Sequence, residues 1–109
     1  MLASLLGSIN KERVLVYLVA RGSGYAREIA RFFEAPLYPV QNALDRLEQA
    51  GVLVSRSVGS TREYELNPRY AARDELSNLL NRALSLYPPG LRDRLASNRT
   101  RPRRKGKPL

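Results

Sequence analysis

Apolar residues recur at helical spacing in three stretches between residues 11 and 50. In each stretch they lie three or four positions apart, which places them on one face of an α-helix. The stretches predict helices over residues 11–20, 27–33 and 38–50, with the inward-facing residues Val14, Leu15, Leu18, Val19, Ile29, Ala30, Phe33, Val40, Ala43, Leu44 and Leu47. Ser8 or Asn10 is expected to cap the first helix, and Gly22-Ser23-Gly24 to end it, because glycine readily adopts the left-handed backbone of a helix C-terminus.

After Gly51 the pattern changes from helical spacing to alternation. Tyr64 and Leu66 alternate with Glu63 and Glu65, so residues 52–57 and 62–66 predict two strands joined by a turn at 58–61. Residues 25–26 are expected to add a very short strand to this hairpin. A further apolar face predicts a helix over residues 70–84, and residues 91–96 predict one or two more turns after the break at 87–90.

The order of these elements predicts the fold class. A short helix, a turn that contains Pro36, an amphipathic helix and a hairpin follow one another in a winged helix-turn-helix. Pro39 suits the first turn of the second helix, where its missing N–H leaves no hydrogen bond unmade. We therefore expect residues 1–69 to form a mainly α-helical DNA-binding domain with a small β-hairpin as its wing. Residues 70–96 are expected to form a helical C-terminal extension for dimerisation, and residues 97–109 a basic, disordered tail.

The composition excludes several classes of function. The 109 residues include no cysteine and no histidine, so the side chains preferred by zinc and those of Ser-His or Cys-His catalysis are lacking. We expect no enzyme activity, no bound metal and no cofactor. No apolar run approaches the roughly 18 residues of a membrane span, and the first residues lack the pattern of a secretory signal. A cytoplasmic, nucleoid-associated protein that does not contact membranes is therefore expected.

The positive charge is unevenly distributed. The formal net charge is +9, and residues 98–109 hold six of the 19 basic residues and no acidic one. Residues 1–97 therefore carry 13 basic against 10 acidic residues, a net +3. A mildly basic body with a strongly basic end favours a polyanionic partner, most often nucleic acid.

The helix over residues 38–50 has a polar face that suits recognition of base edges. This face is made of Tyr38, Gln41, Asn42, Asp45, Arg46 and Gln49. Asn and Gln pair with adenine, Arg pairs with guanine, and a carboxylate accepts from the amino group of cytosine. Tyr38 suits a phosphate or a thymine methyl group, and Asp45 either accepts from cytosine or orients Arg46. The alternative is an ordinary polar helix face in contact with water.

The predicted hairpin carries side chains that suit phosphate contacts. Arg56 and Arg62 lie on its two strands, and Ser60 and Thr61 lie at its tip. Guanidinium and hydroxyl groups bind phosphate oxygens and position a protein on DNA without reading its sequence. The alternative is a hairpin whose charges are simply hydrated.

The helix over residues 70–84 has a wide apolar face, formed by Leu76, Leu79, Leu80, Ala83 and Leu84. We expect this face to contact a second subunit, so that a two-fold dimer sets two recognition helices about 34 Å apart, one turn of the duplex. The alternative is that the helix covers the core of its own chain.

The C-terminal sequence TRPRRKGKPL contains Arg101, Arg103 and Arg104. Basic side chains are attracted to the narrow minor groove of A·T-rich DNA, and Gly106-Lys107-Pro108 is similar to the Gly-Arg-Pro of an AT-hook. The alternative, which we favour, is a tail that binds phosphates without sequence preference.

Residues 11–66 resemble the ArsR-like winged-helix transcriptional regulators. The resemblance lies in the segments LLGSINKERVLVYL, REIARFF, VQNALDRLEQAGVLV and YELNPRY. It implies a homodimer on an inverted repeat, with DNA contacts at Tyr38, Gln41, Asn42, Asp45 and Arg46 and with Arg62 on the wing. The chain lacks the cysteines and histidines of the metal-sensing members, so metal sensing of that kind is not expected.

These observations lead to one main hypothesis about function and two alternatives. The main hypothesis is a dimeric regulator, most simply a repressor, that binds double-stranded DNA of specific sequence. The first alternative is an architectural protein that binds nucleic acid without sequence preference, as the basic tail suggests. The second is an adaptor, similar to an antitoxin, in which the helix over 70–84 or residues 91–95 dock another protein.

Overall fold

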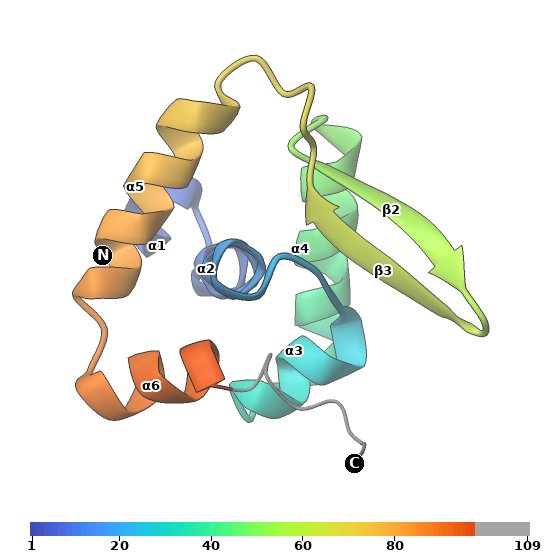
Figure 1. Cartoon of the computed structure of the whole chain (residues 1–109). Helices are drawn as coiled ribbons and strands as arrows, with labels where there is room; N and C mark the ends of the chain where they lie inside the picture. Colours follow the sequence, from blue (N-terminus) through green and yellow to red (C-terminus); the bar gives the residue numbers. More distant parts are fainter. Residues whose placement is uncertain (98–109) are drawn as a thin grey trace, which may run out of the picture.

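The computed structural model describes residues 1–97, which form a mainly helical fold with one small antiparallel sheet (Figure 1). The helices and strands of this part of the chain are α1 (Ala3–Leu6), α2 (Ile9–Arg21), β1 (Gly24–Tyr25), α3 (Ala26–Phe32), α4 (Leu37–Gln49), β2 (Leu53–Val58), β3 (Thr61–Leu66), α5 (Arg73–Ser85) and α6 (Pro89–Ser97). The order of the strands in the sheet is β1-β3-β2. The mainly α class with a small hairpin is therefore confirmed, and the arrangement is compatible with a winged-helix-like fold.

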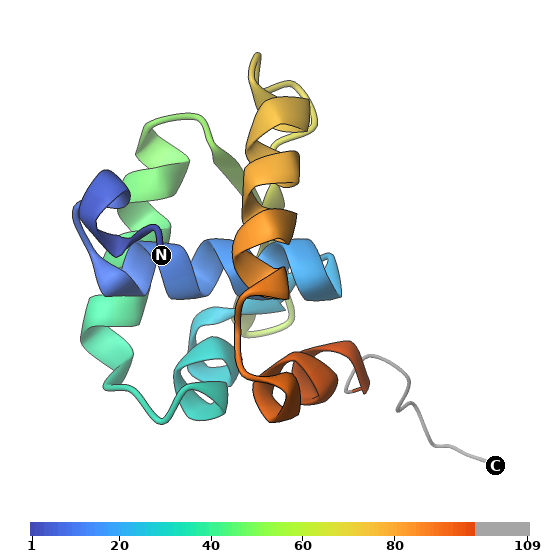
Figure 2. The same ribbon diagram turned by 90° about the vertical axis from the view of Figure 1, so that its left-hand side faces the viewer.

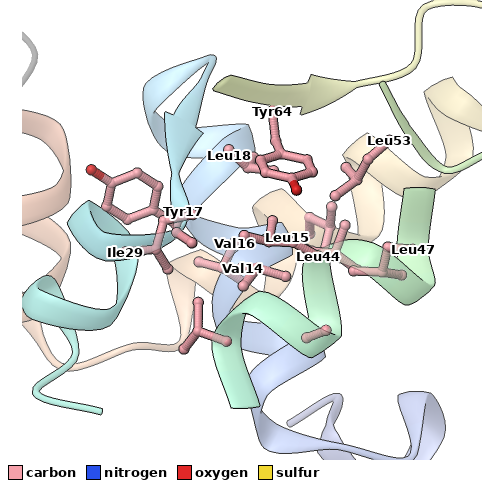
Figure 3. Close-up of a cluster of buried hydrophobic side chains, with 14 of the residues drawn as sticks. Val14, Leu15, Val16, Tyr17, Leu18, Ile29, Leu44, Leu47, Leu53 and Tyr64 are labelled. Carbon is pink, nitrogen blue, oxygen red and sulfur yellow. The ribbon is translucent and has the colours of Figure 1, made fainter. Parts of the chain in front are cut away.

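Helix α2 lies at the centre of the molecule. Figure 1 shows it nearly end-on, with α4 and α5 on opposite sides and α6 below it. The five consecutive residues Val14–Leu18 are at most 1% exposed, and Figure 3 shows them among side chains from α3, α4 and the sheet. The single inward face expected for this helix is therefore too narrow, because Val16 and Tyr17 are also fully buried. A helix that is surrounded by others buries every face.

The start of α2 is capped as expected. The Ser8 hydroxyl oxygen accepts hydrogen bonds from the backbone N–H groups of Asn10 and Lys11, at 3.1 and 3.3 Å. One turn later, the carboxylate of Glu12 is buried and accepts from Leu2 N and from the Tyr87 hydroxyl, each at 2.7 Å. Glu12 thereby joins the N-terminal segment and the turn before α6 to the central helix.

A tight turn connects α3 to α4. Glu34 adopts a left-handed backbone conformation with φ of 53°, and the next residue, Ala35, donates its N–H to the carbonyl of Ala30 at 2.9 Å. This hydrogen bond closes the end of α3 in the manner of a Schellman motif, where glycine is the usual residue. Pro36 follows and precedes the first turn of α4.

The sheet pairs the short strand β1 with the hairpin. Gly24 and Ser55 lie on either side of Tyr64 in the central strand β3. The expected short strand is thus confirmed, although it covers Gly24–Tyr25 rather than residues 25–26. The shift arises because Ala26 is already the first residue of α3.

The C-terminal helices complete the same core. Helix α5 crosses α2 (Figure 2), and Leu80 and Ala83 on its inner side are 0% exposed, as is Leu95 of α6. Arg21 of α2 reaches α6, where its guanidinium donates to the carbonyls of Leu95 and Arg94 at 3.0 and 3.1 Å. The assignment of Leu80 and Ala83 to a subunit interface is therefore wrong for this conformation, because both side chains are buried in the chain's own core, where α5 packs against α2.

The starts of α5 and α6 also differ from the prediction. Helix α5 begins at Arg73 rather than at residue 70, because successive turns hydrogen-bond Tyr70 N to Asn67 O and Arg73 N to Tyr70 O, both at 3.0 Å. Helix α6 has nine residues and begins at Pro89, whereas the sequence predicts a break over residues 87–90. Proline is well suited to the first turn of a helix, where its N–H would have no partner.

Candidate nucleic-acid interface

Helix α4 presents its polar face outward, as its spacing predicted. Its apolar side chains Val40, Ala43, Leu44 and Leu47 are at most 8% exposed. On the opposite side Tyr38 is 78% exposed, and Asn42, Asp45, Arg46 and Gln49 are exposed as well. Gln41 is half-buried at the edge that faces the hairpin. The expected residues of α4 thus lie together on one accessible surface.

Gln41, Asp45 and Tyr64 form a hydrogen-bonded cluster between α4 and the central strand. Gln41 Nε2 donates to Asp45 Oδ1 and to the Tyr64 hydroxyl oxygen, both at 3.0 Å. The Tyr64 hydroxyl in turn donates to Asp45 Oδ1 at 3.3 Å. Within residues 1–97 no hydrogen bond or ion pair joins Asp45 to Arg46, so the expected orienting role toward Arg46 is not seen; adjacent helical residues do not face each other.

Tyr64 anchors this cluster from inside the core. It is 2% exposed, and Figure 3 shows its ring among the buried apolar side chains. Burial, together with the nearby Asp45 carboxylate, raises the pKa of Tyr64 even though the hydrogen bond from Gln41 lowers it. Its hydroxyl therefore stays protonated at neutral pH and remains a donor to Asp45.

The two arginines of the hairpin, Arg56 and Arg62, lie on opposite faces of the sheet. Arg62 pairs with Ser57 and lies two residues from Tyr64, so both side chains point to the face that meets α4. Its guanidinium donates to the hydroxyls of Ser55 and Ser57, at 3.0 and 3.4 Å. Arg56 lies on the other face and forms an ion pair with Glu63 at 3.0 Å. The structure thus places Arg62, but not Arg56, beside the polar face of α4.

The tip of the hairpin is a two-residue turn. Val58 and Thr61 are paired, and Gly59 between them has a positive φ of 62°. Glycine at this first turn position is typical of a type II′ turn. The Thr61 hydroxyl donates to the carbonyl of Val58 at 2.8 Å and so stabilises the turn, while Ser60 is exposed at the tip.

A cationic cleft lies between the tip of the hairpin and the first turns of α3 and α4. This wing cleft has a volume of about 290 Å³ and is lined by Tyr25, Ala26, Arg27, Leu37, Gln41, Ser60, Thr61 and Arg62. It brings two arginines and three hydroxyl-bearing residues to the edge of the polar face. Sequence reasoning missed Arg27, because in the sequence it is only one of several exposed arginines on predicted helices.

A second cleft lies on the other side of α4. This N-terminal cleft has a volume of about 270 Å³ and is lined by Gly7, Ser8, Asn10, Lys11, Pro39, Asn42, Ala43 and Arg46. Lys11 and Arg46 supply its positive charge, and Lys11 was likewise not selected from the sequence. The polar face of α4 therefore has a basic cleft along each edge, which matches a helix lying between two rows of phosphates.

A hollow on the far face of the sheet has a different character. It is about 330 Å³ in volume, larger than either cleft beside α4, but Arg21 and Arg56 are balanced there by Glu63 and Glu65. This hollow does not favour a phosphate. No group of three or more acidic side chains within residues 1–97 is arranged to hold a metal ion, and no helix of this part of the chain is long and apolar enough to cross a membrane.

The residues expected at a dimer interface lie mostly inside the chain. Leu76, Leu79 and Leu84 are half-buried against the same core that contains Leu80 and Ala83. Other apolar side chains are far more exposed, namely Leu5 at 71%, Met1 at 64%, Leu86 at 57% and Ile9 at 45%. Arg101, Arg103 and Arg104 of the tail lie outside the described residues.

The chain matches no protein-family model and no curated protein. Among solved structures it is similar to the X-ray crystal structure of the YusO protein from Bacillus subtilis. The two share 22% sequence identity with a TM-score of 0.57, over 88% of this chain and 76% of YusO. At this level of identity the likeness concerns the fold alone.

Proposed function

We propose that the chain is a winged helix-turn-helix protein that binds duplex DNA of specific sequence and regulates transcription. One observation carries the proposal, namely that the exposed polar face of α4 lies between two basic clefts. B-DNA has a major groove about 12 Å wide, which admits one α-helix and is flanked by phosphates on both sides. In this proposal α3 and α4 are the helix-turn-helix, and the β2–β3 hairpin is the wing.

The contacts divide into two kinds. Tyr38, Asn42 and Arg46 extend from the exposed side of α4 toward the base edges. Arg62 and Arg27 in the wing cleft, and Lys11 in the N-terminal cleft, contact phosphates on either side. Arg56 contributes little, because its ion pair with Glu63 on the far face of the sheet already uses its charge.

We further propose that the protein acts as a homodimeric repressor, with a revised interface. The exposed side chains of Leu5, Ile9 and Leu86 offer apolar surface that the core of the chain does not use, whereas Leu80 and Ala83 do not. A two-fold pair places two α4 helices on successive turns of the duplex, about 34 Å apart. Such a dimer represses most simply by covering the site where polymerase binds.

A binder without sequence preference is the second candidate. It is favoured by the six basic residues among residues 98–109, since such a cluster binds phosphates of any sequence. The two candidates differ in whether one DNA sequence is enriched over others when the protein selects from a mixture.

The test is selection of bound fragments from genomic and randomised DNA, followed by alanine variants. Asn42→Ala is expected to lower affinity for the selected site by about 1–3 kcal/mol and to leave binding to random DNA unchanged. Lys11→Ala is expected to weaken binding to both and to reduce the salt slope by about 0.9. Asn78→Ala, on the exposed side of α5, serves as the control. Failure to enrich any sequence contradicts the proposal and favours the second candidate.

A further inference from the structure

The hydrogen bonds of the Gln41–Asp45–Tyr64 cluster use every donor that it contains. An amide nitrogen has two hydrogens, and Gln41 Nε2 donates to Asp45 Oδ1 and to the Tyr64 oxygen. The single hydrogen of the Tyr64 hydroxyl goes to Asp45 Oδ1. The orientation of the amide follows from this pattern, because a carboxylate oxygen only accepts and the amide must turn its N–H groups toward it.

Two oxygen atoms of the cluster remain available. Within residues 1–97, Gln41 Oε1 and Asp45 Oδ2 accept no hydrogen bond from the protein. Asp45 is exposed, and Gln41 lines the wing cleft. The side-chain atoms that the cluster leaves free for a ligand are therefore acceptors.

Tyr64 holds the arrangement in place before any ligand arrives. It lies in the central strand of the sheet, paired with Gly24 on one side and Ser55 on the other. Its ring is packed in the core, so its hydroxyl has little freedom to move. A free glutamine has several rotamers and two ways to orient its amide, and a fixed one presents a single hydrogen-bonding pattern.

We propose that the cluster makes Gln41 and Asp45 select a base that carries an exocyclic amino group in the major groove, adenine or cytosine, on the strand that they face, with Tyr64 as the positioning residue. This inference rests on the proposed function. An unrestrained glutamine reads adenine through two bonds, accepting from N6 and donating to N7. Here the donors are already used, so N7 is not read, and the amino groups of adenine and cytosine are both acceptable. Guanine and thymine present acceptors at the same place and are disfavoured.

The first experiment uses the wild-type protein and modified bases in the selected site. The base read by Gln41 is identified as the position in the selected site at which Gln41→Ala no longer discriminates among the four bases. If that base is adenine, 7-deazaadenine, which lacks N7 and keeps the amino group, is expected to bind within twofold of adenine. Purine, which keeps N7 and lacks the amino group, is expected to bind about 5- to 150-fold more weakly. If it is cytosine, 2-pyrimidinone, which lacks the amino group, is expected to show the same loss.

The second experiment removes the hydroxyl of the positioning residue. Tyr64→Phe frees one N–H of Gln41, so the same position is expected to become sensitive to 7-deazaadenine and less selective among the four bases. The salt slope is expected to stay unchanged, because phosphate contacts are not involved. Tyr17→Phe is the matched control, since Tyr17 is equally buried and its hydroxyl bonds to Arg21 away from α4.

The outcomes separate this inference from the proposed function. If the wild-type protein enriches no sequence, the proposed function fails. If it enriches a site but loses as much affinity to 7-deazaadenine as to purine, or if Gln41→Ala changes discrimination nowhere, the inference is overturned while the function stands. Base preference that is unchanged in Tyr64→Phe also overturns it. If that variant does not fold, the modified bases on the wild type decide.

Discussion

Leu80 distinguishes a helix that covers its own core from one that pairs with a second subunit. In the structure its side chain is 0% exposed and packs against α2. Leu80→Ala removes three carbons, worth about 0.8 kcal/mol each in transfer from water, or about 2.4 kcal/mol together. The cavity left behind adds to this, so a loss of about 3–4 kcal/mol in the free energy of unfolding is expected.

Such a loss is a large part of the stability of a domain of this size, which is about 5–15 kcal/mol. It corresponds to a fall in Tm of roughly 12–32 °C. Asn78→Ala is the control, because Asn78 lies two residues before Leu80 in α5 and is exposed. Its replacement is expected to change the free energy of unfolding by no more than about 0.5 kcal/mol.

The assay is urea unfolding followed by circular dichroism, at two protein concentrations about a hundredfold apart. If Leu80 is a core residue, Leu80→Ala loses the same stability at both concentrations. If it lies at a subunit interface, its effect depends on concentration, because association stabilises the folded state by mass action. A variant that unfolds within about 0.5 kcal/mol of the parent while dissociating more readily would refute the reasoning.

Three further predictions concern the turn, the buried carboxylate and the tail. Glu34→Gly is expected to stabilise the protein by about 1 kcal/mol in urea unfolding, because Glu34 has φ of 53° and a residue with a Cβ is strained in this left-handed conformation. Glu34→Ala is the control, since alanine keeps the Cβ, and equal effects of the two substitutions would contradict the argument. Tyr87→Phe is expected to cost about 1.5–3 kcal/mol, since it removes a hydrogen bond to the carboxylate of Glu12. Burial raises the pKa of Glu12, but the hydrogen bonds from Tyr87 and Leu2 bring it below its ordinary value. The contribution of Glu12 to the free energy of unfolding is therefore present at neutral pH and is lost as the pH falls through that lowered pKa. Acid unfolding of Tyr87→Phe should begin at higher pH than that of the parent, and an unchanged acid midpoint would count against this role. Deleting residues 98–109 removes six basic residues and is expected to flatten the slope of log affinity against log salt by several units, at about 0.9 per phosphate contact. An unchanged slope means that the tail does not touch DNA. A loss of affinity confined to sites beside A·T tracts means that the tail reads the minor groove.

The candidate interface was partly predictable. The spacing of Val40, Ala43, Leu44 and Leu47 places Tyr38 and Asn42 on the outer side of α4, and the structure agrees. Lys11 and Arg27 were missed, because their charges are unremarkable in the sequence. They gain significance only when α2 and α3 bring them to the edges of α4.

The Gln41–Asp45–Tyr64 cluster also could not be predicted from the sequence. Alternation along residues 62–66 predicts that Tyr64 points inward, but Gln41 lies 23 residues away from it. Their hydrogen bond depends on how the sheet is set against α4, which is a property of the folded chain. The placement of Arg56 and Arg62 on opposite faces of the sheet likewise depends on the fold, because it follows from the register of β2 with β3.

The sequence by itself determined the kinds of element from α2 onward, their order and most of their turns, because hydrophobic spacing, glycine, proline and capping residues act over a few neighbouring positions. The tertiary structure decided what covers each apolar face. The stripe with Leu80 and Ala83 is equally apolar whether α2 or a second subunit lies against it, and α2 does so. Likewise, Val16 and Tyr17 are buried because α4, α5, α6 and the sheet all pack around α2. Periodicity shows that a face avoids water, but the packing of distant segments selects its partner.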